Sequence, residues 1–358
     1  MRLAAQVDHV IGVDTHELTH TLGLVTNTGS EIDDVTIPTD AFGYRRMLTW
    51  VRDRTGDPGR RCWAIEGTGS FGAGLTTFLL EQGEWVVEID RPKRPARRNG
   101  ANSDTLDACR AAREALARNL LAQPRRRGTR EAIRVLLCTR EGAVRARSRA
   151  ICHLKALIVS APTQLRDQLN RDSGDALIER CAGLRIMASH SVEHRATVRV
   201  LRSTARRIQM LTAEADDLEA ELEILVADTA PDLLAEPGVG AISAAQVLNA
   251  WSHPGRLHSE AAFAMLSGSA PIPASSGQTI RHRLNRGGDR QLNRALHTIV
   301  LSRMRFHPET RAYVQRRTAE GRTPREIKRC LKRYVARRLF RLLETTANTN
   351  TQTVPKAA

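Results

Sequence analysis

The sequence predicts an α/β N-terminal domain, a helical middle region and a mainly helical C-terminal domain. Three observations lead to this prediction. Strand and helix periods alternate between residues 8 and 120, residues 129–228 contain no convincing strand, and prolines near 231–237 set off a strongly basic last part. A length of 358 residues suits two or three units. We therefore expect domains at 1–125, 126–230 and 231–345, and a disordered tail at 346–358.

The N-terminal elements follow in a definite order. Short polar turns separate three strand-like runs, at 10–14, 19–26 and 32–37, which predicts an antiparallel meander. The elements expected after the meander are a helix at 40–54, a strand at 61–66, a helix at 71–82, a strand at 85–90 and a helix at 103–121. This order is typical of the ribonuclease H-like α/β fold.

The middle region carries a near-heptad apolar pattern that starts at Leu201 and ends at Leu225. Such spacing predicts a helical hairpin or a short coiled coil. Four heptads do not decide whether the seam packs inside one chain or between protomers.

The net charge of +16 favours a polyanionic partner, and nucleic acid is the obvious class. Between residues 281 and 340 the balance is 18 Lys or Arg against four acids. Because no apolar run approaches the roughly 20 residues that cross a bilayer, and no secretory signal begins the chain, we expect a cytoplasmic protein without a membrane partner. The six cysteines form no CxxC pair, so we expect reduced, mostly buried thiols.

Carboxylates follow two strands that should be neighbours in this fold. Asp14 ends the first strand and Glu66 ends the fourth, while Asp104 and Asp107 lie three apart near the start of the last helix, on one face. Four carboxylates at one edge repel each other unless cations lie between them, and oxygen ligands suit Mg²⁺ or Mn²⁺. Taken singly, each acid could also be a turn former, a helix cap or a surface residue.

Basic and histidine side chains accompany these acids. The run that could hold phosphates near the metal consists of Arg91, Lys93, Arg94, Arg97 and Arg98. A run of this kind is also common as a solvated loop. His16 follows Asp14 by two positions and could assist proton transfer, but we expect it to face solvent.

Two further segments of the C-terminal part could contact DNA. Gly238 and Gly240 resemble the turn of a helix-hairpin-helix element, where backbone N–H groups can approach a phosphate. A small-residue loop at 266–277 contains Ser275 and Ser276 and precedes four arginines: Arg281, Arg283, Arg286 and Arg290. A serine beside arginines can become a nucleophile toward phosphate.

The four acids, together with Gly-Ser-Ala-Pro-Ile-Pro-Ala-Ser-Ser-Gly at 268–277 and Arg-Leu-Asn-Arg-Gly-Gly-Asp-Arg-Gln-Leu-Asn at 283–293, closely resemble the DEDD-type transposases of the insertion sequence 110 family. The resemblance covers residues 8–345. It implies a RuvC-like first domain, a coiled-coil linker and a transposase domain with a nucleophilic serine. The metal ligands that it implies are Asp14, Glu66, Asp104 and Asp107.

The resemblance also implies a mechanism and partners. The serine would attack a DNA phosphate and form a phosphoserine link, and a non-coding bridge RNA would guide the recombinase as a dimer or tetramer. The family's serine position selects Ser276, with Ser275 as second choice. We therefore expect a DNA recombinase. A Mg²⁺-dependent nuclease of the Holliday junction resolvase kind, or an inactive nucleic-acid-binding remnant, are the alternatives.

Overall fold

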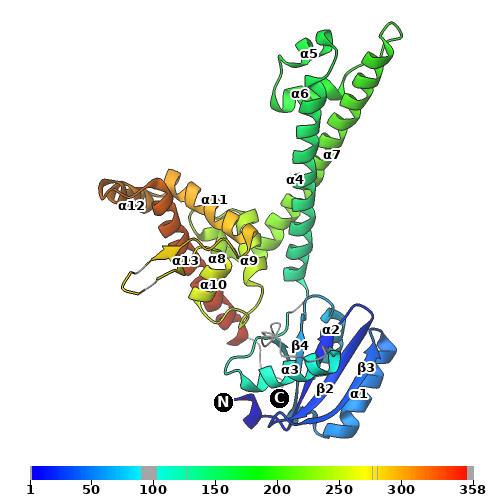
Figure 1. The fold of residues 1–358 in the computed structure, drawn as a ribbon, viewed down its shortest axis with the longest axis vertical. Helices are drawn as coiled ribbons and strands as arrows, with labels where there is room; N and C mark the ends of the chain where they lie inside the picture. The colour runs from blue at the N-terminus through cyan, green and yellow to red at the C-terminus, as the bar shows by residue number, and fades with distance from the viewer. Residues whose placement is uncertain (1, 90–102, 126, 276, 280, 353–358) are drawn as a thin grey trace. The chain divides into compact units, whose positions relative to one another are not determined.

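A computed structural model describes residues 2–89, 103–125, 127–275, 277–279 and 281–352. The chain forms two compact units (Figure 1). One unit combines Met1–Arg130 with Ala250–Ala358, and the other is Glu131–Asn249. Among the described helices, none combines the length and apolar character needed to cross a membrane.

A five-stranded sheet forms the centre of the N-terminal part. Its strand order is β3-β2-β1-β4-β5, with β1, β2 and β3 antiparallel and with β4 and β5 parallel to β1. The strands are β1 (His9–Thr15), β2 (Thr19–Thr26), β3 (Glu31–Pro38), β4 (Arg61–Glu66) and β5 (Val86–Ile89). The predicted meander and the predicted pairing of the first and fourth strands are both confirmed.

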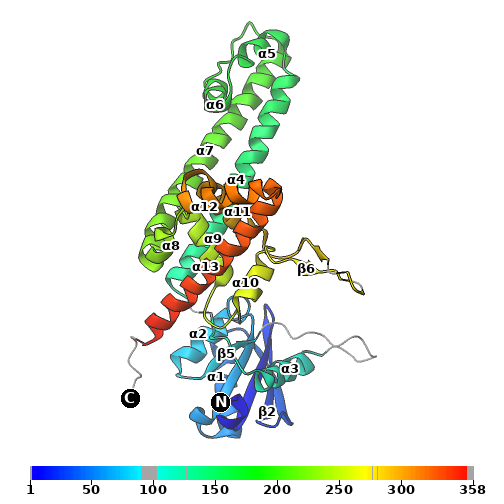
Figure 2. The same cartoon turned by 90° about the vertical axis from the view of Figure 1, so that its left-hand side faces the viewer.

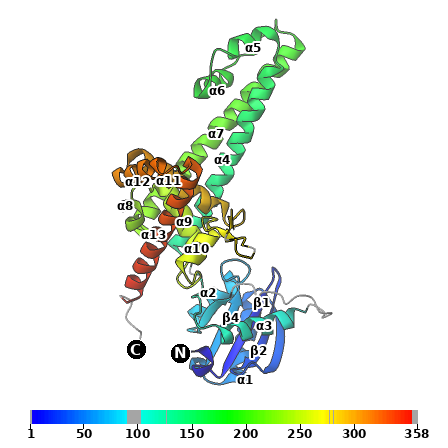
Figure 3. The same cartoon turned by 60° about the vertical axis from the view of Figure 1, so that its left-hand side comes forward.

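Helices cover both faces of this sheet. On one face, α1 (Ala41–Thr55) and α2 (Ala73–Glu81) pack on a buried cluster that includes Ile11 and Trp63. The opposite face, with Val10 and Ala64, is covered by α3 (Asp104–Ala117), which lies across the strands in Figure 3. Alternate residues of one strand thus serve two different cores. Short 3-10 helices lie at Leu3–Ala5 and Pro58–Arg60.

Helix α3 packs closely on the sheet at two glycine residues, Gly12 of β1 and Gly23 of β2. A Cβ added to Gly12 would lie 1.9 Å from the carbonyl oxygen of Ala108, and one added to Gly23 would lie 2.5 Å from the sulfur of Cys109. Any side chain at Gly12 would therefore push the helix away from β1. The absence of a side chain there is what brings the first turn of α3 close to the end of β1.

The second unit is built around a long antiparallel pair of helices, α4 and α7. Its helices are α4 (Thr129–Val159), α5 (Thr163–Leu169), α6 (Gly174–Ala182), α7 (Val192–Thr229), α8 (Pro231–Ala235) and α9 (Ala241–Trp251). Figures 1–3 show α4 and α7 side by side, and Arg140 of α4 hydrogen-bonds Glu219 of α7 at 3.0 Å. The predicted apolar positions of α7 from Leu201 to Ala215 are buried in clusters that they share with α4, α5 and α6. This part of the seam is thus filled within the chain.

The C-terminal part is helical apart from one short hairpin. It contains α10 (Glu260–Leu266), β6 (Ile272–Pro273), β7 (His282–Arg283), α11 (Arg290–Phe306), α12 (Pro308–Ala319) and α13 (Pro324–Gln352). The rings of Phe263 and Phe340 pack 5.7 Å apart and join α10 to α13. The hairpin projects from the helices in Figure 2.

Three expectations differ from the structure. Helix α3 ends at Ala117 instead of continuing to residue 121, and α13 runs to Gln352, into the tail expected to be disordered. In α13 the Thr345 hydroxyl donates a hydrogen bond to the carbonyl of Arg341, so this polar side chain finds a partner within the helix. Of the six free cysteines, the three that are buried are Cys62, Cys109 and Cys181. Cys138 and Cys152 are exposed on α4, and Cys330 on α13 is partly buried.

Candidate metal and nucleic-acid sites

The sheet register places two of the predicted acids beside each other. The pairing of β1 with β4 joins Val13 to Ile65, so the next residues, Asp14 and Glu66, are neighbours at the same edge. Gly12, two residues before Asp14, faces α3, and side chains alternate along a strand. The side chains of Asp14 and Glu66 therefore lie on the face that α3 covers.

The first turn of α3 brings the other two acids to this edge. The Ser103 hydroxyl caps the helix by accepting a hydrogen bond from the backbone N–H of Leu106 at 3.2 Å. Asp104 and Asp107 follow directly, in the turn where the helix dipole favours negative charge. Asp107 also accepts a hydrogen bond from Arg110 at 2.6 Å. The helix start is thus fixed beside the end of β1.

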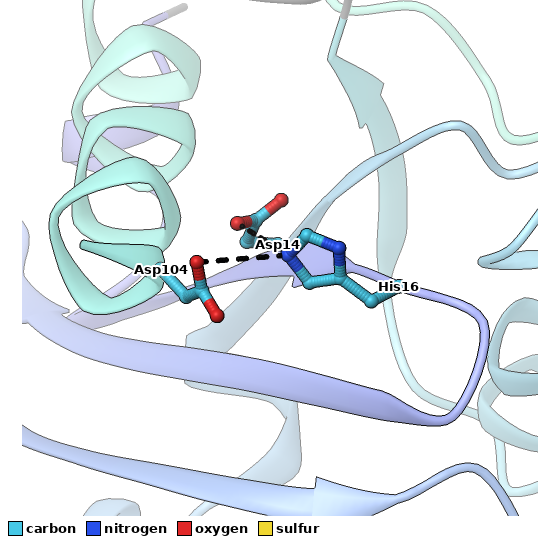
Figure 4. Close-up of side chains that lie close together, drawn as sticks. All are labelled: Asp14, His16 and Asp104. Carbon is cyan, nitrogen blue, oxygen red and sulfur yellow. Dashed lines mark hydrogen bonds and ion pairs between the residues drawn. The ribbon is translucent and has the colours of Figure 1, made fainter. Parts of the chain in front are cut away.

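Asp14, His16 and Asp104 form a tight cluster (Figure 4). The Nε2 atom of His16 lies 3.2 Å from Asp14 Oδ2 and 3.7 Å from Asp104 Oδ1. One ligand atom from each residue lies within 4.8 Å of the others. The Asp14 side chain is 16% exposed and that of Asp104 is 60% exposed, so the cluster opens to solvent on the helix side.

The surroundings of Asp14 disfavour the negatively charged form of its carboxyl group. Burial raises the pKa of its carboxyl group, His16 acts in the opposite direction, and the negative charges of Asp104 and Asp107 raise the pKa further. Asp107 therefore influences the same carboxyl group, but it is not part of the tight cluster and accepts a hydrogen bond from Arg110. A divalent cation would relieve this repulsion, and the carboxylate donor set fits a hard ion.

The predicted serine loop is buried at Ser267 and Ala270 and exposed at residues 273–275. Ser275 Oγ accepts a hydrogen bond from the backbone N–H of Arg281 at 3.3 Å, across the hairpin of β6 and β7. Ser276 lies outside the described residues, as do Arg91, Lys93, Arg94, Arg97 and Arg98. The four arginines beside the hairpin are all exposed: Arg281, Arg283, Arg286 and Arg290.

Comparison with known proteins places both regions in one family. Residues 11–161 match the DEDD transposase family of IS110, and residues 231–315 match the family described as Transposase IS116/IS110/IS902. The chain belongs to the IS110 transposase family. A protein of insertion element IS110 from Streptomyces coelicolor, itself described as uncharacterized, is 32% identical over 127 residues. That match covers 35% of this chain and 31% of the relative, so the chain matches about a third of the relative's length.

In this IS110-family chain, His16 is the site residue that sequence reasoning left aside. It was expected to face solvent, and its side chain is 50% exposed, yet it lies between Asp14 and Asp104. The signal was its spacing, because residues two apart at a strand end point to the same side of the sheet.

The predicted glycine turn lies between α8 and α9 of the IS110-family chain. Gly238 has a φ of +75°, in the left-handed region that favours glycine. A Cβ at Gly240 would meet open space, so no neighbouring group demands a glycine there. The role of these glycines in phosphate binding stays a prediction.

Proposed function

We propose that the chain is a DNA transposase that cuts and rejoins the DNA of a mobile element as a site-specific recombinase. The observation that carries the proposal is the meeting of Asp14 and Asp104 at one sheet edge, in a chain whose two matched regions both belong to a transposase family. In this proposal the first domain is RuvC-like, and Asp14, Glu66, Asp104 and Asp107 are its acidic residues.

The proposed acidic residues would hold Mg²⁺ or Mn²⁺. A bound divalent ion would supply Lewis-acid stabilisation of the oxygens that attack and leave phosphorus. The chain's own part is to fix the ligands. The β1–β4 register holds Asp14 beside Glu66, and the cap on α3 holds Asp104 at the same edge. His16 orients the Asp14 carboxylate through its 3.2 Å contact.

The covalent step of the proposal uses a serine. The Oγ of Ser276 forms a bond to a DNA phosphorus, the bond from that phosphorus to one sugar oxygen breaks, and the serine's proton is transferred to the departing sugar oxygen by way of solvent. The phosphoserine link keeps the phosphodiester energy, so a sugar hydroxyl of another strand can reverse the step. Ser275 is the second choice for this role.

The proposed partners are DNA and a structured non-coding guide RNA, and the proposed assembly is a dimer or tetramer. The net charge of +16 and the exposed arginines from Arg281 to Arg290 support binding to nucleic acid. The guide RNA and the assembly come from the resemblance to the family.

The deciding experiment is incubation of the purified chain with Mg²⁺, its flanking non-coding RNA and labelled junction DNA, followed by denaturing electrophoresis. We expect a protein–DNA adduct in the unmodified chain and in Ser275→Ala, none in Ser276→Ala, and strongly slowed adduct formation in Asp14→Asn. An adduct that is lost in Ser275→Ala and kept in Ser276→Ala would move the nucleophile to Ser275. Cleavage without any adduct would instead indicate a hydrolytic nuclease, and binding without cleavage would indicate an inactive binder.

A further inference from the structure

A cavity of about 640 Å³ lies at the base of the β6–β7 hairpin. One wall is formed by the two segments that enter and leave the hairpin, 268–271 and 284–286, and the other by residues 329–337 of α13. This size lies in the range of small-molecule sites. We call the sheet edge that carries Asp14, Glu66, Asp104 and Asp107 the acidic edge. No described residue of β1, β4 or α3 lines the cavity, so the cavity is distinct from the acidic edge.

The cavity is strongly basic. Its cationic lining residues are Arg286, Arg329, Lys332, Arg333 and Arg337. None of the lining residues that the structure describes is acidic, although Glu260 on α10 contacts Arg337 at 3.0 Å from outside the lining. Burial, and then the charge of Arg329, lowers the pKa of Lys332. Cations held this close together attract an anion such as a phosphate.

Apolar side chains share the cavity with these cations. Leu284 and Tyr334 are about half exposed, at 50% and 52%, so both present apolar surface in the cavity. The Tyr334 ring is braced edge-on by Tyr313, with ring centroids 5.9 Å apart. A braced, exposed aromatic ring beside cations is the arrangement on which proteins stack single-stranded bases.

Hydrogen bonds hold the cavity walls in place. Lys332 Nζ donates to Asn293 Oδ1 at 2.8 Å, and Asn293 Nδ2 donates to the carbonyl of Ser267 at 2.6 Å. A Cβ at Gly288 would lie 2.3 Å from the carbonyl of Leu266, so the segment after the hairpin packs directly on α10. The backbone segments that carry the lining side chains are therefore held in place.

We call β6, β7 and the segment that joins them the serine hairpin, because this segment carries Ser275 and Ser276. We propose that the cavity binds one nucleotide of the DNA strand on which the serine hairpin acts. Arg286, Arg329 and Lys332 take the phosphate, and the base lies against Tyr334 and Leu284. The inference rests on the proposed function and deepens it, because a nucleotide anchored at the base of the hairpin would position the next phosphate along the strand toward the loop that carries Ser275 and Ser276.

Cys330 gives a direct test, because it lines the cavity, whereas Cys138 and Cys152 are exposed on α4 and serve as internal controls. The full chain is titrated with a single-stranded thymidine oligonucleotide in EDTA, and alkylation of each cysteine is followed by mass spectrometry. We expect protection of Cys330 alone. An oligonucleotide with abasic sites should bind about fivefold more weakly or worse, the effect of losing one stacked base.

Variants sharpen the test. Tyr334→Ala and Arg286→Ala should weaken the protection of Cys330, whereas Tyr334→Phe should keep it. The matched control is Arg311→Ala, an exposed arginine of α12 that does not line the cavity. Equal protection by the abasic strand would overturn the nucleotide site in favour of a general basic surface. Stronger protection by a uridine RNA would overturn the assignment to DNA, and no protection would overturn the inference altogether.

The outcome is separable from that of the proposed function, because EDTA removes metal-dependent chemistry from this assay. If Cys330 is protected but no protein–DNA adduct ever forms, the cavity binds a nucleotide and the recombinase mechanism is wrong. If the adduct forms while Cys330 stays fully reactive, the mechanism stands and the nucleotide site is wrong.

Discussion

The acidic edge of the sheet and the serine hairpin are built in opposite ways. Asp14 follows four buried residues of β1, and α3 packs directly on Gly12 beside it. The β6–β7 ladder has two residue pairs, Ile272 with Arg283 and Pro273 with His282, and three of these residues are exposed. The position of the acids is thus a property of a buried core, whereas the described part of the hairpin is held at its base.

This difference teaches where substitutions will act. A change in the packing of the sheet should displace the acids and lower the free energy of unfolding together. A change in the hairpin should alter reactivity and leave stability nearly untouched, because surface substitutions away from a core change stability little.

The largest expected effect is on catalysis at the acidic edge. Asp14→Asn should lower adduct formation on the order of 10²- to 10³-fold, the scale of losing one preorganised electrostatic group at a reaction centre. The fold should persist, because asparagine fills the same volume. Rates of adduct formation measured beside Glu31→Gln, an exposed acid that pairs with Arg113, check this. Equal rates in the two variants would show that the acidic edge is not the reaction centre.

A glycine-to-alanine substitution should reduce stability more in the sheet than in the hairpin. Gly12→Ala places a Cβ 1.9 Å from a backbone oxygen and should lower the free energy of unfolding by about 3 kcal/mol. Gly277→Ala meets no atom within 4 Å, so its left-handed φ of +56° leaves a strain of about 1 kcal/mol in an exposed loop. Urea unfolding of both variants gives the two values. Similar values would contradict the contrast between core and hairpin.

The sheet domain should also lose stability in acid through His20. Burial lowers the pKa of this histidine from 6.5 to about 4. The unfolded chain takes up the proton near pH 6.5, so stability is complete above that pH and falls toward pH 4, by up to about 3 kcal/mol. His20→Leu should flatten this slope in urea unfolding between pH 4 and 7. The neighbouring buried change Thr21→Val should keep it, and a slope unaltered by His20→Leu would assign the acid sensitivity elsewhere.

The smallest effect is expected at Ser275. Its hydroxyl accepts one hydrogen bond, at 3.3 Å, in an exposed hairpin. Ser275→Ala should therefore change the free energy of unfolding by less than about 0.5 kcal/mol. Thermal unfolding of this variant beside the unmodified chain measures the difference. A loss comparable to that of Gly12→Ala would mean that the hairpin is part of a core.

The sequence predicted the sheet well because its strands are buried on one or both faces. The run from Thr19 to Thr26 gives β2 with its bounds, and the neighbouring position of the first and fourth strands follows from the fold order. The meeting of Asp14 with Asp104 was predictable for the same reason, since strand ends and the start of a capped helix share one edge.

The end of α3 and the position of His16 depend on contacts between residues far apart in the sequence, which the sequence pattern does not predict. Helix α3 ends early because the chain turns to place Ala122 beside β5, where its carbonyl accepts a hydrogen bond from the backbone N–H of Glu88 at 2.9 Å. Local apolar periodicity contains no information on that pairing. Likewise, His16 has a neighbour on a helix almost ninety residues away, Asp104.

The first unit is made from the two ends of the chain, and this has a consequence for synthesis. Its C-terminal share begins at Ala250, after the 119 residues of Glu131–Asn249. At about 5–20 residues per second, a ribosome needs roughly 6 to 24 s to deliver that insertion. During this interval the sheet exists without the helices that complete its unit. The first unit can therefore be completed only after the long helical pair has left the ribosome.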